Sequence, residues 1–140
     1  MEPSQQPKKI IIVEDNPSLA DIYKTRLELI GYRVYIAYNG ITGLYFIQKE
    51  LPDLVLLDIM IPDIAGDQVL ATIRNSAWGK DIPVYVISNL NESEVPTDLR
   101  KLGIEGYSVK ANLSNDQLDE IVDGILRKAP AKETDSSAAN

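Results

Sequence analysis

Three carboxylates directly follow two short apolar runs of this chain. The run at residues 10–13 leads into Glu14 and Asp15, and the run at residues 54–57 leads into Asp58. Continuous Ile, Val and Leu runs of this length are typical of strands buried on both faces, as in a parallel sheet covered by helices. The working site of such a sheet lies outside the carboxyl ends of its strands, so we expect the three acids to lie together.

Three neighbouring carboxylates need a compensating positive charge or a proton. At ~4 Å and an effective dielectric constant of ~20, one pair repels by ~4 kcal/mol. Carboxylate oxygens are ligands that hard divalent cations prefer, and we interpret the cluster as a metal site. Each acid taken singly could also be a solvated residue at a strand end.

Two further side chains complete a chemical set at the same edge. Ser88 ends an apolar run at residues 83–88, and Lys110 follows another at residues 106–109. With the acids they supply a carboxylate nucleophile in Asp58, ligands for a divalent cation, a hydroxyl donor and a cation for developing charge. These are the parts of a phosphoryl-transfer site.

Alternating strand and helix patterns define the elements that must position these residues. We expect strands at residues 9–14, 32–37, 54–58, 83–88 and 106–109, and helices at residues 17–30, 40–50, 65–75, 93–102 and 115–128. Five βα units predict an α/β fold: a doubly wound parallel sheet of five strands, in the order 2-1-3-4-5, with helices on both faces.

The helix boundaries carry local signals. Asn16 and Pro17 predict an N-cap and a first-turn proline, and Ser114 with Gln117 predicts a capping box. The start of the fourth helix is the least defined, because Pro96 and the polar residues before it permit a late start. In the last helix, Leu118, Ile121, Val122, Ile125 and Leu126 form an apolar stripe, and we expect Asp119, Glu120 and Asp123 to face water.

Composition excludes several classes of function. The 140 residues suit one domain, and we expect residues 8–128 to fold, with disordered segments at residues 1–7 and 129–140. The net charge of -7 argues against binding nucleic acid or anionic membranes. The chain contains neither Cys nor His, which excludes disulfides, thiolate or ordinary catalytic zinc sites and a phosphohistidine. With no signal peptide or spanning segment visible, we expect a cytoplasmic protein.

Over about 120 of its 140 residues, the chain resembles a response-regulator receiver domain of two-component signalling. The matching residues are 13–17 (VEDNP), 58–62 (DIMIP) with Gly66, Ser88, and 103–110 (GIEGYSVK).

The resemblance implies that Asp58 accepts a phosphoryl group from a histidine kinase or a histidine phosphotransfer protein. It also implies Mg²⁺ (or Mn²⁺) held by Asp15, Asp58 and the backbone carbonyl of Met60, with Glu14 acting mainly through water. Lys110 would neutralise charge on the transferred group. The absence of histidine fits this scheme, because the donor is another protein.

The resemblance further implies a regulatory switch rather than an enzyme with a separate substrate. Ser88 would donate a hydrogen bond to the phosphoryl group, and Tyr107 would fill the space that Ser88 vacates. Tyr107 could also be an ordinary half-buried strand tyrosine. The implied output face consists of the fourth helix, fifth strand and fifth helix, and binds a downstream protein or a second copy of the chain.

Five positions bear on how closely the chain follows the family. Ala111 stands where receivers usually carry proline, and a cis bond before a residue other than proline costs ~3 kcal/mol. The sequence leaves the Lys110–Ala111 isomer open, and a trans bond would reshape the loop that follows. Asn89 replaces the usual small residue, and Ala65 the acid often found before Gly66. Met60 and Leu90 cannot orient a hydrolytic water, which predicts slow self-dephosphorylation.

Other interpretations remain open on the sequence alone. A phosphatase of the haloacid-dehalogenase type requires an acid two residues after its nucleophile, where this chain has Met60. A flavodoxin-like cofactor binder requires a phosphate loop that no strand leads into. A receiver-like scaffold that works without phosphate is the closer alternative, and it depends on Ala111 and Asn89. The sequence is also compatible with a single-domain regulator, a phosphate relay or part of a longer protein.

Overall fold

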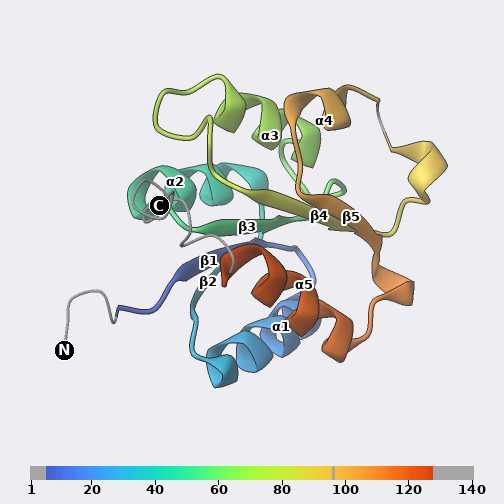
Figure 1. The fold of residues 1–140 in the computed structure, drawn as a ribbon. Coiled ribbons are helices and arrows are strands. Elements are labelled where there is room, and N and C mark those ends of the chain that lie inside the picture. The colour runs from blue at the N-terminus through green and yellow to red at the C-terminus, as the bar shows by residue number, and fades with distance from the viewer. Residues whose placement is uncertain (1–5, 96, 128–140) are drawn as a thin grey trace, which may run out of the picture.

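The computed structural model describes residues 6–95 and 97–127 as a central parallel sheet between two layers of helices (Figure 1). The strand order is β2-β1-β3-β4-β5, as predicted. The strands are β1 (Lys9–Val13), β2 (Arg33–Ala37), β3 (Leu54–Leu57), β4 (Val84–Ser88) and β5 (Gly106–Val109). Each lies within one residue of its predicted bounds, so the carboxyl ends of β1 and β3 lie side by side.

Helices cover both faces of the sheet. Figure 1 shows α1 (Pro17–Ile30) and α5 (Asn115–Leu126) on one face. The other face carries α2 (Gly40–Glu50), α3 (Gly66–Arg74) and α4 (Thr97–Leu102). Short 3₁₀ turns, η2 (Glu92–Glu94) and η3 (Lys110–Asn112), precede α4 and α5.

The alternation of side chains along the strands explains why both faces are covered. In β1, Ile11 and Val13 belong to the core beneath α2, α3 and α4, whereas Ile10 and Ile12 belong to the core beneath α1 and α5. All four are buried. Burial on both faces fixes the strand register, because a slip of one residue would exchange the two sets.

The predicted helix caps are confirmed. Asn16 Oδ1 accepts a hydrogen bond from Leu19 N at 3.1 Å, and Pro17 is the first residue of α1. Ser114 and Gln117 form the reciprocal capping box of α5. These caps fix where α1 and α5 begin, directly after the loops that carry the acids and Lys110.

The predicted start of the fourth helix at residue 93 is wrong. Residues 92–94 form the separate turn η2, and α4 begins at Thr97. The turn is closed locally, because Glu94 N donates to Asn91 O and the Glu94 carboxylate accepts from Asn91 N, both at 2.8 Å. A polar side chain that hydrogen-bonds its own backbone competes in this way with continuous helix.

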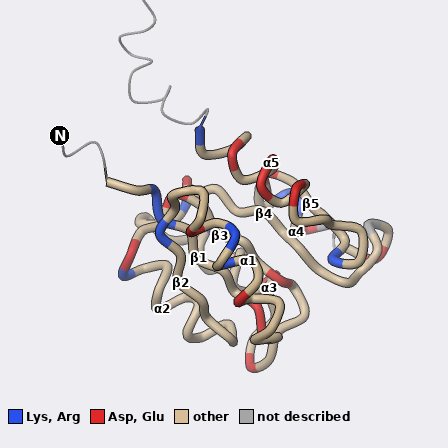
Figure 2. The backbone as a smooth tube through the Cα atoms, turned by 90° about the horizontal axis from the view of Figure 1, so that it is seen from below, with Lys and Arg blue, Asp and Glu red and all other residues tan. Residues whose placement is uncertain are grey.

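Two acids of α5 that were expected to face water instead pair across to α1 and its C-terminal loop. Asp119 Oδ2 lies 2.6 Å from Arg26 Nη2. Asp123 Oδ1 accepts hydrogen bonds from Tyr32 Oη at 2.5 Å and Arg127 Nε at 2.9 Å. Figure 2 shows how acidic positions recur along α5. The sequence pattern did not reveal Arg26 and Tyr32 as partners, because they lie about 90 residues away.

Arg74, the last residue of α3, ties several chain segments together through its guanidinium. Its Nε donates to Leu102 O at 2.9 Å, and its Nη2 donates to Gly103 O at 2.9 Å. Its Nη1 donates to Gly79 O at 3.2 Å. These bonds fasten the carboxyl-terminal end of α4 to α3.

The predictions for residues 1–5 and 128–140 fall outside the described residues. Among the residues that are described, no helix has the length and apolar character needed to cross a membrane.

Candidate functional site

The sheet brings the three predicted acids together. Val13 pairs with Leu57 in adjacent strands, so Glu14 and Asp58 each follow one member of the same pair. Glu14, Asp15 and Asp58 each offer a carboxylate oxygen within 4.8 Å of the others. Glu14 and Asp58 are buried and Asp15 is exposed. A cluster of this kind, open on one side, has the oxygen ligands for a hard divalent cation.

Lys110 supplies the positive charge that the acids require. Its Nζ lies 2.6 Å from Asp58 Oδ2 and 2.8 Å from Glu14 Oε1. The described residues contain no cis peptide bond, so the Lys110–Ala111 bond, whose isomer the sequence left open, is trans. The chain turns through η3 at this point, and Lys110 still reaches both carboxylates.

Burial and charge have opposite effects on the pKa values of Glu14 and Lys110. Burial raises the pKa of Glu14 above its usual value, and hydrogen bonds from Lys110 and from Asn16 N only partly offset this effect. Burial alone would lower the pKa of Lys110, but its hydrogen bonds to Asp58 and Glu14 outweigh burial and raise it. Lys110 is therefore charged at neutral pH and partly neutralises the acids.

Asp58 is held by the loop that follows it. Its Oδ1 accepts a hydrogen bond from Met60 N at 3.0 Å, and Gly66 N donates to Ile59 O at 2.8 Å. A Cβ atom at Gly66 would lie 2.3 Å from Asp58 O and 2.5 Å from Ile59 Cα. Only glycine therefore allows α3 to begin this close to Asp58.

Ser88 and Tyr107 lie on the neighbouring strands. Ser88 is fully buried at the end of β4, and its Oγ is 3.5 Å from Leu90 N, at the outer limit of a hydrogen bond. Tyr107, half-buried on β5, donates from its hydroxyl to Leu90 O. The loop after Ser88 is thus bonded to β5 through Tyr107, while Asn89 in that loop is exposed.

Two side chains near the acids were not singled out from the sequence. Tyr23 of α1 is buried, and its pKa is raised by burial and by the nearby Glu14 charge. Asp63 has a left-handed backbone (φ 69°) and bonds to α2. Tyr23 fits the apolar periodicity of α1, so nothing in the sequence distinguishes it from an ordinary core residue. An Asp after proline in a loop is a recognisable turn signal for Asp63.

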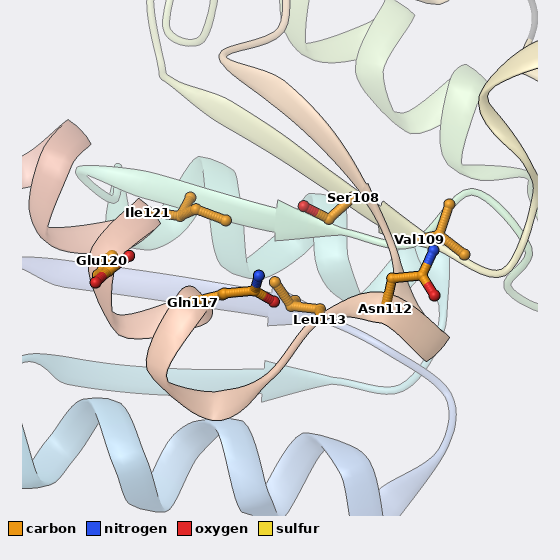
Figure 3. Close-up of a pocket in the computed structure, with 7 residues that line it drawn as sticks. All are labelled: Ser108, Val109, Asn112, Leu113, Gln117, Glu120 and Ile121. Atoms are coloured by element: carbon orange, nitrogen blue, oxygen red, sulfur yellow. The ribbon is translucent and has the colours of Figure 1, made fainter.

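A separate pocket of about 370 Å³ lies between β5 and α5. Figure 3 shows its seven lining residues, which are Ser108, Val109, Asn112, Leu113, Gln117, Glu120 and Ile121. None of them belongs to the acid cluster. The pocket is therefore distinct from the acid cluster.

Comparison with known proteins identifies the family. The family model for the response regulator receiver domain matches residues 10–123. The chain therefore belongs to the response regulator receiver domain family, whose members act in two-component signalling. This membership agrees with the fold, with the acid cluster and with the regulatory rather than metabolic role predicted from the sequence.

Curated and solved relatives support the assignment. The chain is 33% identical over 135 residues to "Probable transcriptional regulator ycf27" of Porphyra purpurea, covering 96% of this chain and 54% of the relative. It is similar to a solved CheY-like receiver domain protein from Methanospirillum hungatei, with 25% identity, a TM-score of 0.79 and coverage of 90% and 98%. It is also similar to the Mn²⁺-bound form of response regulator Rcp1, with 28% identity, a TM-score of 0.70 and coverage of 82% and 89%. The chain spans about half the length of the curated relatives it matches.

Proposed function

We propose that this receiver domain is switched by phosphorylation of Asp58. The observation that carries the proposal is the position of Lys110 Nζ, 2.6 Å from an Asp58 oxygen inside a cluster of three acids. A carboxylate with a purely structural role does not require this combination of a buried acid, a half-buried lysine and two further acids.

The transfer itself exchanges one bond for another. A carboxylate oxygen of Asp58 attacks the phosphorus of a phosphohistidine on a donor protein, the phosphorus–nitrogen bond breaks, and the imidazole leaves and takes up a proton. An acyl phosphate remains on Asp58. The ammonium of Lys110 stabilises the negative charge that this group carries in the transition state and the product.

Asp15, Asp58 and the Met60 carbonyl are the groups we assign to Mg²⁺ or Mn²⁺, with Glu14 acting mainly through water. The oxygen-only donor set of the cluster fits a hard cation, and the similar protein Rcp1 has been solved with Mn²⁺. The cation would offset the repulsion between the carboxylates and the incoming phosphoryl group. Glu14 already accepts from Lys110, which agrees with an indirect role.

The phosphoryl group would act on the β4–α4 loop. Ser88 would donate to a phosphoryl oxygen, and this would change the loop that Tyr107 bonds at Leu90 O. We assign output to the face of α4, β5 and α5, where the pocket beside Ser108 and Gln117 lies (Figure 3). That face would bind a downstream protein or a second copy of the chain.

Phosphorylation is expected to be long-lived. Met60, which is 56% exposed, and the half-buried Leu90 lie in the two loops beside Asp58 and Ser88. Neither apolar side chain can hydrogen-bond an attacking water. Decay of the acyl phosphate within seconds in Mg²⁺ would contradict this expectation, and Met60→Glu should shorten the lifetime.

The direct test is the intact mass of the protein after incubation with Mg²⁺ and a small acyl phosphate. One added phosphoryl group that requires both Asp58 and Mg²⁺ is expected, with Asp58→Ala and a Mg²⁺-free sample as controls. No adduct on a folded protein would favour the phosphate-independent scaffold. Against that alternative, Lys110 reaches Asp58 despite Ala111.

A further inference from the structure

We infer that Asp63 is a positioning residue for the phosphoacceptor loop, because its carboxylate fastens this loop to the first turn of α2. The inference rests on the proposed function for its effect on phosphorylation. The geometric part, that Asp63 fixes residues 58–63, stands independently of it.

The carboxylate of Asp63 accepts three backbone hydrogen bonds. Gly40 N donates to Oδ1 at 2.8 Å, Ile41 N donates to Oδ2 at 2.9 Å, and Ile64 N donates to Oδ1 at 2.5 Å. Gly40 and Ile41 are the first two residues of α2, whose amides have no partner within the helix. One side chain therefore joins two segments that are 22 residues or more apart in the sequence.

The backbone of Asp63 shows that this arrangement is imposed by its contacts. Its φ of 69° lies in the left-handed region, which is unfavourable for a non-glycine residue. Burial would raise the pKa of Asp63, but the bonds from Ile41, Ile64 and Gly40 outweigh it and lower the pKa. The carboxylate is therefore charged at neutral pH and interacts favourably with the positive end of the α2 dipole.

The contact between the loop and α2 leaves little room for adjustment. A Cβ atom at Gly40 would lie 2.5 Å from Ile64 Cγ1 and 2.9 Å from Ile64 O. The loop therefore rests directly on the first turn of α2.

Met60 lies between two fixed points. At one end, its amide donates to Asp58 Oδ1. At the other, Asp63 is bonded to α2. The direction of the Met60 carbonyl, which we assign to the cation, follows from both attachments. Release of Asp63 would let this carbonyl turn while the acid cluster stayed intact.

Asn39 provides a matched control. It is the N-cap of α2, and its Oδ1 accepts from Thr42 N at 2.8 Å. Asn39→Ala and Asp63→Gly both remove a cap from the same helix, but only Asp63→Gly detaches the loop. Glycine is chosen because it accepts the left-handed backbone without strain. Asp63→Asn tolerates the same backbone and keeps one acceptor oxygen, so it serves as the conservative variant.

The readouts are Mg²⁺ affinity by calorimetry, the phosphorylation rate at saturating Mg²⁺, and hydrogen exchange of the Met60 amide. We expect Asp63→Gly to weaken Mg²⁺ binding about tenfold, as loss of a group that orients a metal ligand does. We expect Asp63→Asn to give an intermediate loss and Asn39→Ala to remain within about twofold of wild type. The Met60 amide should exchange faster in Asp63→Gly than in Asn39→Ala.

Equal effects of Asp63→Gly and Asn39→Ala, or wild-type Mg²⁺ affinity in Asp63→Gly, would overturn the inference. If the wild-type protein neither binds Mg²⁺ nor accepts phosphate, the proposed function fails instead, and amide exchange alone decides the role of Asp63. If Asp63→Gly does not fold, the same comparison is made with Asp63→Asn.

Discussion

The ammonium of Lys110 bridges Asp58 and Glu14, lying 2.6 Å and 2.8 Å from their oxygens. Both carboxylates are buried, so each loses hydration that the ammonium replaces. Lys110 thus stabilises the two buried acids, in addition to the role in phosphoryl transfer that we propose for it.

Lys110→Ala should lower the free energy of unfolding by about 3 kcal/mol at pH 7 without Mg²⁺, because it leaves two buried carboxylates without a cation. Added Mg²⁺ should recover part of this loss, and phosphorylation should slow at least tenfold. Urea unfolding with and without Mg²⁺ measures the first effect. Lys101→Ala, at an exposed position of α4, is the control and should change stability by less than about 0.5 kcal/mol.

Gly66→Ala should lower stability by about 2 kcal/mol and weaken Mg²⁺ binding, because the added methyl group must displace the backbone of Asp58 or Ile59. Gly124→Ala is the matched control, because a Cβ atom at this exposed position of α5 would have no neighbour within 4 Å. It should raise stability by about 0.5–1 kcal/mol through helix propensity. Thermal unfolding and calorimetry compare the two, and an unchanged Mg²⁺ affinity in Gly66→Ala would contradict the close-approach argument.

Tyr107→Phe should loosen the β4–α4 loop, because it removes the hydrogen bond to Leu90 O. We expect faster amide exchange in residues 89–94 of the unphosphorylated protein and a stability loss of about 1 kcal/mol. The phosphorylation rate should change by less than about threefold, because the Tyr107 hydroxyl bonds to Leu90 O of the β4–α4 loop. A strongly reduced rate would place Tyr107 in the transfer step instead.

The hydrogen bond between Tyr32 and Asp123 predicts a pH dependence at alkaline pH. Burial and the Asp123 carboxylate raise the pKa of Tyr32 from 10.0 to about 12. A raised pKa gives stability that is fully present below pH 10 and is lost as the pH rises toward 12. Tyr32→Phe should therefore be less stable than wild type at pH 8, and the difference should shrink between pH 10 and pH 12. Urea unfolding across this range measures it, with Tyr38→Phe as an exposed control whose difference should stay constant.

Most of the fold was predictable because its signals are local. The apolar run at residues 54–57, the Asn16 cap and the Ser114 capping box each act within a few residues, and the structure confirms them. The cluster of Glu14, Asp15 and Asp58 followed from the rule that parallel strands end at one edge. The sequence was therefore sufficient to predict which residues make up the cluster.

The remaining features depend on contacts that the sequence patterns did not indicate. Asp119 matched a solvated face of α5, yet it pairs with Arg26 of α1. The late start of α4 depends on the local closure of η2 by Glu94. No periodic pattern in the sequence marks the attachment of Asp63 to α2, because it depends on a single residue with a left-handed backbone.

The hydrogen bonds from Arg74 hold the carboxyl-terminal end of α4. Its last carbonyl groups are held by the guanidinium, whereas the chain before its first turn leads back through η2 to the loop that Tyr107 bonds at Leu90. If phosphorylation acts through Ser88 as we propose, the disturbance would reach α4 at its amino-terminal end, opposite the end that Arg74 holds. Any resulting displacement of α4 would then be smallest at the end that Arg74 holds.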